Sequence, residues 1–243
     1  MSLRVEGLSK SFVERAVLKS IDFSIPEGQI TFFLGQSGTG KSVLLKMLVG
    51  LLKPDSGAIF IQDANVTDYS ERQWRQVRKN CGLVFQQPAL FDSLTVFENL
   101  AFGPRRLTTL TEAQISERAE RVLKSVHLSS DVLTKRPGQL SFGMQKRVSL
   151  ARTLILEPKI LLFDEPTTGL DPVTTTAINR LILEISKEYG TTSVVVSHDM
   201  KCAMEIADRI LFLDQGQIVF DGPSSQIKKA EHPLVQGFFQ EIH

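Results

Sequence analysis

The chain has 243 residues, of which 42% are hydrophobic and 23% are charged, and its formal net charge at pH 7 is +1. This composition is that of an ordinary globular protein, and the length predicts one domain, or one domain with a sizeable insertion. Basic and acidic residues are interspersed, so the charge gives no basis for a nucleic acid or a membrane surface as partner.

Targeting signals and membrane-spanning segments are not expected either. The start, MSLRVEGLSKSF, lacks a basic stretch followed by an apolar run, so we predict no secretory signal. No uninterrupted apolar run approaches the ~20 residues that span a bilayer. Cys81 and Cys202 are too far apart for a CxxC pair, and we expect both to be buried, reduced thiols. These features predict a soluble, cytoplasmic chain.

Short apolar strands alternate with helical segments along the chain, which predicts an α/β fold with a largely parallel core sheet. The first part is richer in strands than the rest. Residues 3–8, 21–25 and 57–63 are expected to form an antiparallel layer beside the main sheet.

The motif GQSGTGKS, residues 35–42, matches a P-loop. It follows an apolar strand over residues 30–34 and precedes a helix over residues 41–50, whose N-terminus adds a positive dipole end. Glycines let backbone N–H groups approach phosphate oxygens, the lysine reaches the β and γ phosphates, and the serine hydroxyl binds Mg²⁺. The sequence therefore predicts a nucleoside triphosphate site made by Gly35, Gln36, Ser37, Gly38, Thr39, Gly40, Lys41 and Ser42.

From residue 88 to about residue 157 helical patterns dominate, which predicts a mostly helical insertion in the α/β core. Residues 111–126 read as an amphipathic helix that begins with a capping box formed by Thr111 and Gln114. Further on, Ser141 is expected to cap a helix with free N–H groups at its start, which is a second anion-binding end. We place the helical subdomain at residues 88–155 and the core, with its β subdomain, at residues 1–87 and 156–243.

The segment ILLFDE, residues 160–165, reads as a buried strand that ends in two carboxylates. In a P-loop protein the natural roles are Asp164 holding Mg²⁺ through its water shell and Glu165 positioning or deprotonating the attacking water. The alternative is a solvent-exposed cap at the strand end.

The remainder of the core is predicted in four pieces. A helix runs from Pro172 to a stop at Gly190, followed by a buried strand over residues 192–197. A short helix from about Met200 and a hairpin over residues 209–222 come next. The C-terminal segment, with Phe238 and Phe239, is left with two alternatives, packing on the core or contacting a partner.

The order of GQSGTGKS, Gln86, LSFGMQ, ILLFDE, GLD and His198 resembles the ATP-binding subunit of an ABC transporter over nearly the whole chain. The resemblance implies a P-loop NTPase (RecA-like) core with an antiparallel β subdomain and an inserted helical subdomain. It also implies ATP and Mg²⁺ as ligands and a homodimer that sandwiches two ATP molecules.

Residue roles follow from the same resemblance. Ser141 and Gly143 would contact the ATP held by the partner's P-loop, and Asp171 would lie at the dimer seam. Gln86 would contact Mg²⁺ and water and relay to the membrane subunit, while His198 would contact the γ-phosphate and help to order Glu165.

Two positions need separate comment. Phe12 stands where the family carries an aromatic that stacks on adenine, with core packing as the alternative. Phe142 replaces the first glycine of the family's usual LSGGQ signature. We expect Phe142 to have ordinary helix-start geometry, with its ring turned away from the nucleotide.

The segments PALFDSLTVFENLAF and SHDMKCAMEIADRILFLDQGQIVFDG, with Met144 in the signature, are similar to the ATPases of Mla/MCE-type phospholipid transporters. This implies integral membrane permease subunits and an MCE substrate-binding protein as partners. It also implies a docking groove near residues 86–97 and a peripheral location on the cytoplasmic face of the bacterial inner membrane.

ATPases of polar amino-acid importers share much of the scaffold and remain the alternative. DNA-acting ABC ATPases need very long coiled coils before the signature, translation-type members carry two cassettes, and a GTPase needs an NKxD motif. None of these features is present, so no nucleic-acid partner is expected.

Overall fold

The structure is a computed structural model, and it describes residues 2–13 and 15–240, the last two of these by backbone only. A six-stranded sheet has the order β10-β9-β3-β8-β7-β6. Its strands β3, β6, β7, β8 and β9 are parallel, and only β10 runs antiparallel to its neighbour among these six. The strands are β3 (Ile30–Leu34), β6 (Cys81–Val84), β7 (Ile160–Asp164), β8 (Thr192–Ser197), β9 (Arg209–Asp214) and β10 (Gln217–Pro223).

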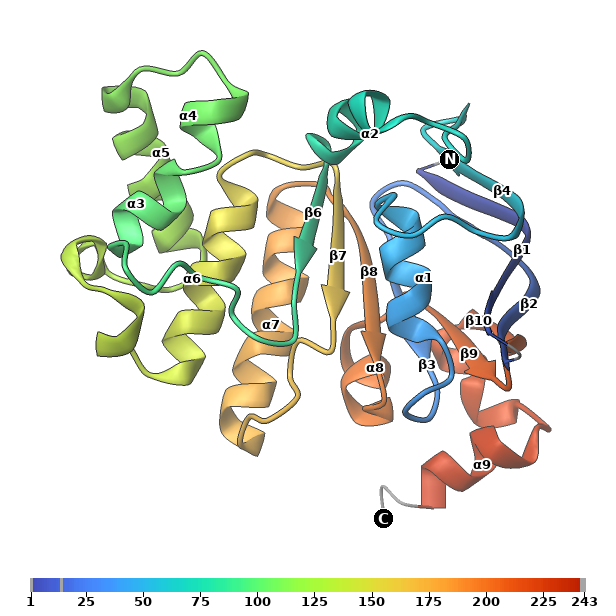
Figure 1. Cartoon of the computed structure of the whole chain (residues 1–243). Coiled ribbons are helices and arrows are strands. Elements are labelled where there is room, and N and C mark those ends of the chain that lie inside the picture. The colour runs from blue at the N-terminus through green and yellow to red at the C-terminus, as the bar shows by residue number, and fades with distance from the viewer. Residues whose placement is uncertain (1, 14, 241–243) are drawn as a thin grey trace.

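The predicted antiparallel layer is a four-stranded sheet of order β2-β1-β4-β5. Its strands are β1 (Leu3–Phe12), β2 (Arg15–Ile25), β4 (Ser56–Ile61) and β5 (Ala64–Asn65). The helix α1 (Lys41–Leu48) lies between this layer and the parallel sheet, as Figure 1 shows. The β1–β2 hairpin extends beyond the predicted strand ends; this outer part is largely exposed, although Leu18 is buried in the core and Val17 packs against it.

The continuous apolar runs of the central strands are explained by burial on both faces. Phe33 packs with α1 in one core, whereas Phe32 packs in a second core with α7 (Pro172–Glu188) and α8 (Met200–Ile206). All five residues of β3 are buried. A strand covered on both sides needs no polar alternation, so its sequence reads as an unbroken apolar run.

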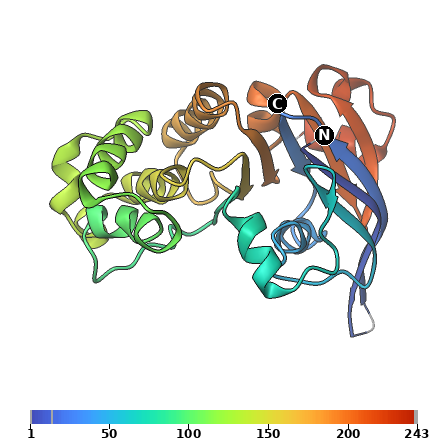
Figure 2. The same ribbon diagram turned by 90° about the horizontal axis from the view of Figure 1, so that it is seen from above.

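The helical subdomain lies to one side of the two sheets (Figures 1 and 2). It contains α3 (Val96–Ala101), α4 (Pro104–Leu107), α5 (Glu112–Ser125) and α6 (Phe142–Leu154), with 3₁₀ turns at Ser130–Thr134 and Pro137–Gln139. The predicted capping box is present, since Thr111 and Gln114 exchange hydrogen bonds at the start of α5. The strand β6 and the helix α2 (Glu71–Arg78), which precede this subdomain, were not assigned from the sequence.

One expectation, on the cysteines, needs revision. Cys202 is a buried free thiol as predicted, but Cys81 is only partly buried. Burial raises the pKa of each thiol to about 12, so both stay protonated at neutral pH.

The C-terminal helix α9 (Pro233–Gln240) packs on the core of its own chain. The ring of Phe238 meets Phe212 of β9 edge-on, with 5.0 Å between the ring centroids. The side chain of Phe239 lies outside the described residues. A last turn of 3₁₀ helix at Ser224–Lys229 joins β10 to α9.

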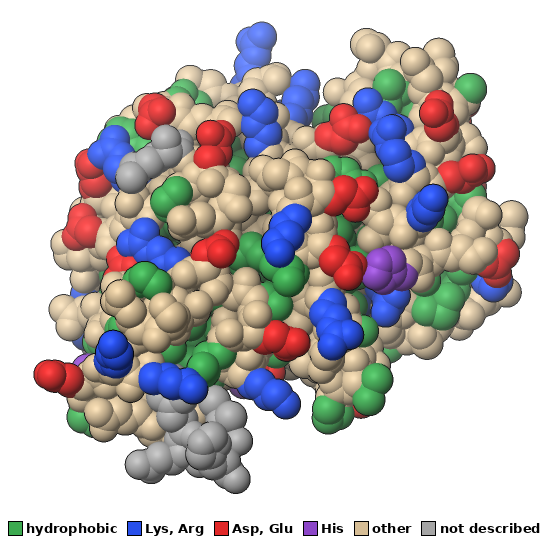
Figure 3. Space-filling model, turned by 180° about the vertical axis from the view of Figure 1, so that it is seen from behind, with side chains coloured by type: hydrophobic (Ala, Val, Ile, Leu, Met, Phe, Trp, Pro, Cys, Tyr) green, Lys and Arg blue, Asp and Glu red, His purple; other side chains and the backbone are tan. Residues whose placement is uncertain are grey.

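The surface carries both signs of charge. On the face opposite to that of Figure 1, basic and acidic side chains are interspersed (Figure 3), in agreement with the formal net charge of +1. Within residues 2–13 and 15–240, no helix combines the length and apolar character that crossing a bilayer requires.

Candidate functional site

The P-loop connects β3 to α1 at the carboxyl end of the parallel sheet. Its glycines are required partly by their neighbours. A Cβ on Gly35 would lie 2.3 Å from the carbonyl oxygen of Leu213 in β9, and a Cβ on Gly40 would lie 2.8 Å from a methyl of Val17 in β2. Both glycines also have left-handed backbone angles. Substitution at either position would therefore displace the loop before any phosphate is bound, a reason that the sequence reading did not include.

Lys41 is folded back over the loop that precedes it. Its side chain is only 5% exposed, and its Nζ donates hydrogen bonds to the carbonyl oxygens of Gly35 (2.8 Å) and Gln36 (2.9 Å). Burial lowers the pKa of Lys41, and the nearby carboxylates of Glu165 and Asp164 act in the opposite direction. A buried cation with a third donor position available is suited to binding a phosphate oxygen.

Ser42 and Asp164 form the candidate Mg²⁺ site. The Ser42 hydroxyl donates to Asp164 Oδ1 at 2.8 Å, so the first turn of α1 meets the last residue of β7. Hydroxyl and carboxylate oxygens are the hard ligands that Mg²⁺ takes, and in nucleotide sites phosphates and waters complete its shell. Among the described residues there is no cluster of three or more His, Cys, Asp or Glu side chains that could hold a metal without such help.

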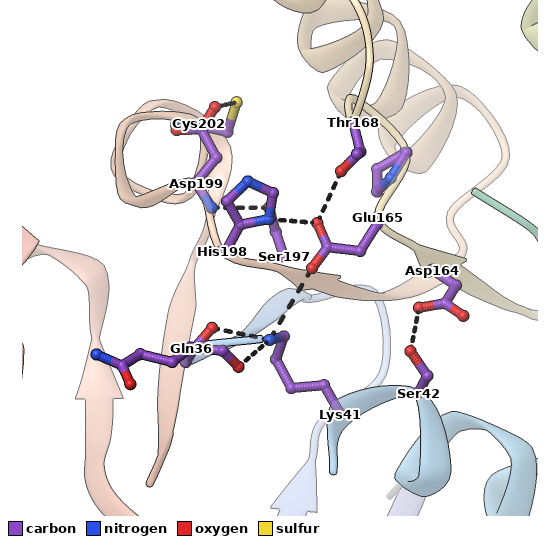
Figure 4. A network of polar contacts seen from close by, with 12 residues as sticks. Gln36, Lys41, Ser42, Asp164, Glu165, Thr168, Ser197, His198, Asp199 and Cys202 are labelled. Carbon is purple, nitrogen blue, oxygen red and sulfur yellow. Dashed lines mark hydrogen bonds and ion pairs between the residues drawn. The ribbon is translucent and has the colours of Figure 1, made fainter. Parts of the chain in front are cut away.

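Glu165 is held at the centre of the site from two sides (Figure 4). Its Oε2 accepts from Thr168 Oγ1 at 3.0 Å and lies 2.8 Å from His198 Nδ1, while its Oε1 lies 3.9 Å from Lys41 Nζ. The residue follows β7 directly and has a left-handed φ of 50°. Non-glycine residues in this region are strained and concentrate at functional sites.

Most of these groups border one cavity of about 850 Å³, although Gly35 and Asp164 are not among its lining residues. Phe12 lies at its edge with 44% of its surface exposed, so the alternative of core packing for Phe12 is wrong. Thr39 does not line it; its hydroxyl donates back to the carbonyl of Gln36, and it lines a neighbouring cavity with Ser37 and Gly38. The lining residues are Phe12, Arg15, Val17, Gln36, Ser37, Gly38, Gly40, Lys41, Ser42, Val43, Gln86, Glu165, Thr168, His198 and Phe238.

Ser141 and Gly143 do not reach this cavity. They line a different one, of about 440 Å³, together with Thr174 of α7. Ser141 caps α6 as predicted, accepting from the backbone N–H of Met144, and Phe142 is the first residue of that helix. Phe142 thus has the expected helix-start position.

Asp171 is likewise away from the P-loop cavity. It caps α7, accepting hydrogen bonds from the backbone N–H groups of Val173 and Thr174 and from the Thr174 hydroxyl. These hydrogen bonds, the Thr174 hydroxyl first, lower the pKa of Asp171. One chain therefore contains the two predicted phosphate-binding ends in separate places.

Sequence reasoning missed three residues that the structure places at or beside the site. Thr168 binds Glu165, Phe238 lines the cavity, and Lys146 of α6 donates to the loop after Glu165. A threonine three residues after a strand-end carboxylate can bond back to it across a turn, which is a signal present in the sequence. The other two contacts depend on the tertiary fold.

Comparisons with known proteins agree with this arrangement. A family model described as "ABC transporter" matches residues 18–168. The probable ribonucleotide transport ATP-binding protein mkl of Mycobacterium tuberculosis (strain ATCC 25618 / H37Rv) is 37% identical over 98% of this chain, which spans 66% of that relative's length. The arginine transport ATP-binding protein ArtM of Bacillus subtilis is 40% identical and covers 99% of both chains.

Two further matches are a plant relative and a solved dimer. The protein TRIGALACTOSYLDIACYLGLYCEROL 3, chloroplastic, of Arabidopsis thaliana is 39% identical over 94% of this chain and 70% of its own length. The solved dimer of the ATP-binding cassette MJ0796, bound to ADP and Pi in a post-hydrolysis state, superposes with a TM-score of 0.81 at 32% identity and covers 91% of this chain and 98% of its own.

Proposed function

Since the chain belongs to the ATP-binding subunits of the ABC transporter family, which are ATPases, we propose that two copies of it bind and hydrolyse ATP between them and thereby power attached membrane subunits. The observation that carries this proposal is the position of Glu165. Its carboxylate is fixed by Thr168 and His198 and faces the P-loop lysine across the cavity.

Binding is assigned to the P-loop and its surroundings. Lys41, the loop N–H groups and the N-terminus of α1 hold the phosphates, and Phe12 at the cavity edge stacks on the base. Ser42 and Asp164 hold Mg²⁺, with Gln86 nearby on the cavity wall. When bound, the metal would neutralise charge on the phosphate oxygens.

The hydrolytic step is assigned to Glu165. Its carboxylate orients a water molecule toward the γ-phosphorus and accepts its proton, as the new P–O bond forms and the bond to ADP breaks. His198, which follows β8 directly and has 57% of its side chain exposed, keeps the carboxylate in place and contacts the γ-phosphate.

The dimer is proposed because the two phosphate-binding ends of one chain lie in separate cavities. In a closed pair, Ser141 and Gly143 of each copy contact the ATP on the other copy's P-loop, and Asp171 lies at the seam. The MJ0796 cassette, which shares this fold, was solved as a dimer. Closure on ATP drives the membrane subunits, and hydrolysis resets the pair.

Lys41→Ala is expected to weaken ATP binding about 10- to 100-fold, because hydrogen bonds to charged groups contribute about 1.5 to 3 kcal/mol. Calorimetry or a fluorescent nucleotide measures the affinity. The matched control is Lys46→Ala, which removes an exposed lysine from the same helix. Unchanged affinity in Lys41→Ala would contradict the assignment of the nucleotide site.

The face for the membrane subunit is assigned to the segment after β6. Phe85 and Phe91 are 41% and 42% exposed, which is unusual for large apolar side chains. The buried amide of Asn99 fixes Phe91, since it accepts from the Phe91 N–H at 2.8 Å and donates to its carbonyl at 3.1 Å. Two exposed aromatic side chains, one of them on a fixed backbone, suit insertion of a permease helix, and such docking would place the chain on the cytoplasmic face of an inner membrane.

Phe91→Asp is therefore expected to abolish co-purification of the chain with an integral membrane partner. Leu51→Asp, at an exposed apolar position outside this segment, is the control and should leave the complex intact. Mass spectrometry of the wild-type complex identifies the partner. Retention of the partner by Phe91→Asp, or co-purification with DNA or ribosomes instead, would overturn the assignment.

For the cargo we propose a phospholipid in an MCE-type system. The proposal is supported by the similarity of the sequence segments described above and by a relative whose name contains a galactolipid. The alternative is a polar amino acid or other small solute. Its support is the similarity to ArtM, which is named as an arginine transport protein. The same purified complex distinguishes the two, since a bound lipid and an MCE protein are expected only for the first.

A further inference from the structure

Lys146 is a buried lysine that the proposed mechanism does not use. It lies on α6, five residues after the Ser141 cap, and it is only 6% exposed. Burial lowers its pKa, and no carboxylate of the described residues forms an ion pair with its ammonium group. A buried, unpaired ammonium group is costly. Its presence calls for a specific set of contacts.

Those contacts lie in the turn that follows Glu165. Lys146 Nζ donates to the carbonyl oxygen of Pro166 at 2.7 Å and to that of Thr168 at 3.3 Å. The ring of Phe142, one helical turn earlier, lies 5.3 Å from the same Nζ and covers it by a cation–π contact. The ammonium group thus joins the helix that starts at the signature serine to the loop between β7 and α7.

The same turn holds the hydrolytic carboxylate. Thr168 donates its backbone N–H to the Glu165 carbonyl at 3.3 Å and its hydroxyl to Glu165 Oε2 at 3.0 Å. Because Lys146 binds the Thr168 carbonyl, the position of α6 fixes the residue that orients Glu165. His198 acts on the carboxylate from the other side, but it is more than half exposed. The support that comes through α6 is therefore the one anchored by a buried side chain.

We propose that Lys146 is a positioning residue for ATP hydrolysis, which acts through the Pro166–Thr168 turn to hold Glu165 in its reactive orientation. It links the helix that contacts one ATP to the carboxylate that acts on the other. The inference rests on the proposed function and adds to it the route by which the helical subdomain reaches the reacting group. The alternative is that Lys146 only fastens α6 to the core.

The test compares Lys146→Met, which keeps the apolar stem but removes the donor, with Lys124→Met at an exposed position on α5. The turnover number of Lys146→Met is expected to fall about 10- to 100-fold, because small misplacements of reacting groups have effects of this size. Its ATP affinity should stay within about twofold of wild type, because the P-loop is untouched. Lys124→Met should match wild type in both.

A double-mutant comparison distinguishes a role of Lys146 in orienting Glu165 from a role in only attaching α6 to the core. Thr168→Val breaks the next contact toward Glu165, so the variant carrying both substitutions should lose no more turnover than the more impaired single variant. Losses that multiply would overturn the inference, as would wild-type turnover in Lys146→Met or a joint loss of ATP affinity. Lys146→Gln, which keeps an N–H donor, should recover part of the turnover and serves the same test if the methionine variant does not fold. A wild-type chain that fails to hydrolyse ATP would instead overturn the proposed function itself.

Discussion

Replacing Glu165 by glutamine is expected to lower the turnover number about 10²- to 10⁴-fold while ATP still binds, because a positioned general base contributes a factor of this size. The amide keeps the shape of the side chain and can still meet Thr168, but it cannot accept the proton from water. ATP binding without hydrolysis should then hold two copies together. Phosphate release measures the first effect, and size-exclusion chromatography with ATP measures the second.

The control for this experiment is Glu120→Gln, at an exposed carboxylate on α5 away from the site. It should hydrolyse ATP at the wild-type rate. A normal rate in Glu165→Gln would show that another group handles the water. A loss of ATP binding in that variant would show that Glu165 has a structural role in the P-loop cavity instead.

Replacing Ser141 by arginine should reduce hydrolysis on the order of 10²- to 10³-fold, the range that follows loss of a group that stabilises the transition state. The N–H groups at the start of α6 are expected to meet the partner's γ-phosphate, and a long side chain at the cap would keep the two copies apart. ATP binding to an isolated copy should be unchanged, because Ser141 lies outside the P-loop cavity.

Three measurements decide this second prediction: turnover, ATP affinity under dilute conditions, and the fraction of dimer formed with ATP. Ser225→Arg, at an exposed position in the Ser224–Lys229 turn, is the matched control and should behave as wild type in all three. If Ser141→Arg abolished ATP binding by the single copy, the action of Ser141 on the partner's nucleotide would be wrong.

Much of the fold could be predicted from the sequence because local patterns and tertiary burial agree. The apolar run of β3 predicts a buried strand, and the pattern at Thr111 predicts a capping box at a helix start. Both predictions are confirmed. The helix α2 escaped prediction because Trp74 is its one buried residue among those described, so it has no apolar stripe. The strand β6 is four residues long and contains Gly82, which weakens its signal.

The residues of the site also include some that the sequence could predict and some that it could not. Lys41, Ser42 and Glu165 belong to short motifs whose spacing is tied to phosphate chemistry, so their gathering around one cavity could be anticipated. Lys146 could not, because its partners are the backbone oxygens of residues 20 and 22 positions further along the chain. Contacts of a side chain with remote carbonyls have no sequence signature. They become visible only when the packing of α6 on the core is known.

Ser141 and the P-loop line different cavities of one chain, and this separation has a genetic consequence. A copy damaged at Lys41 still offers an intact signature helix, and a copy damaged at Ser141 still offers an intact P-loop. In the proposed dimer, each mixed pair of the two inactive variants would contain one fully intact ATP site beside one doubly damaged site. Two alleles that each abolish ATP hydrolysis should therefore restore activity when they are expressed together.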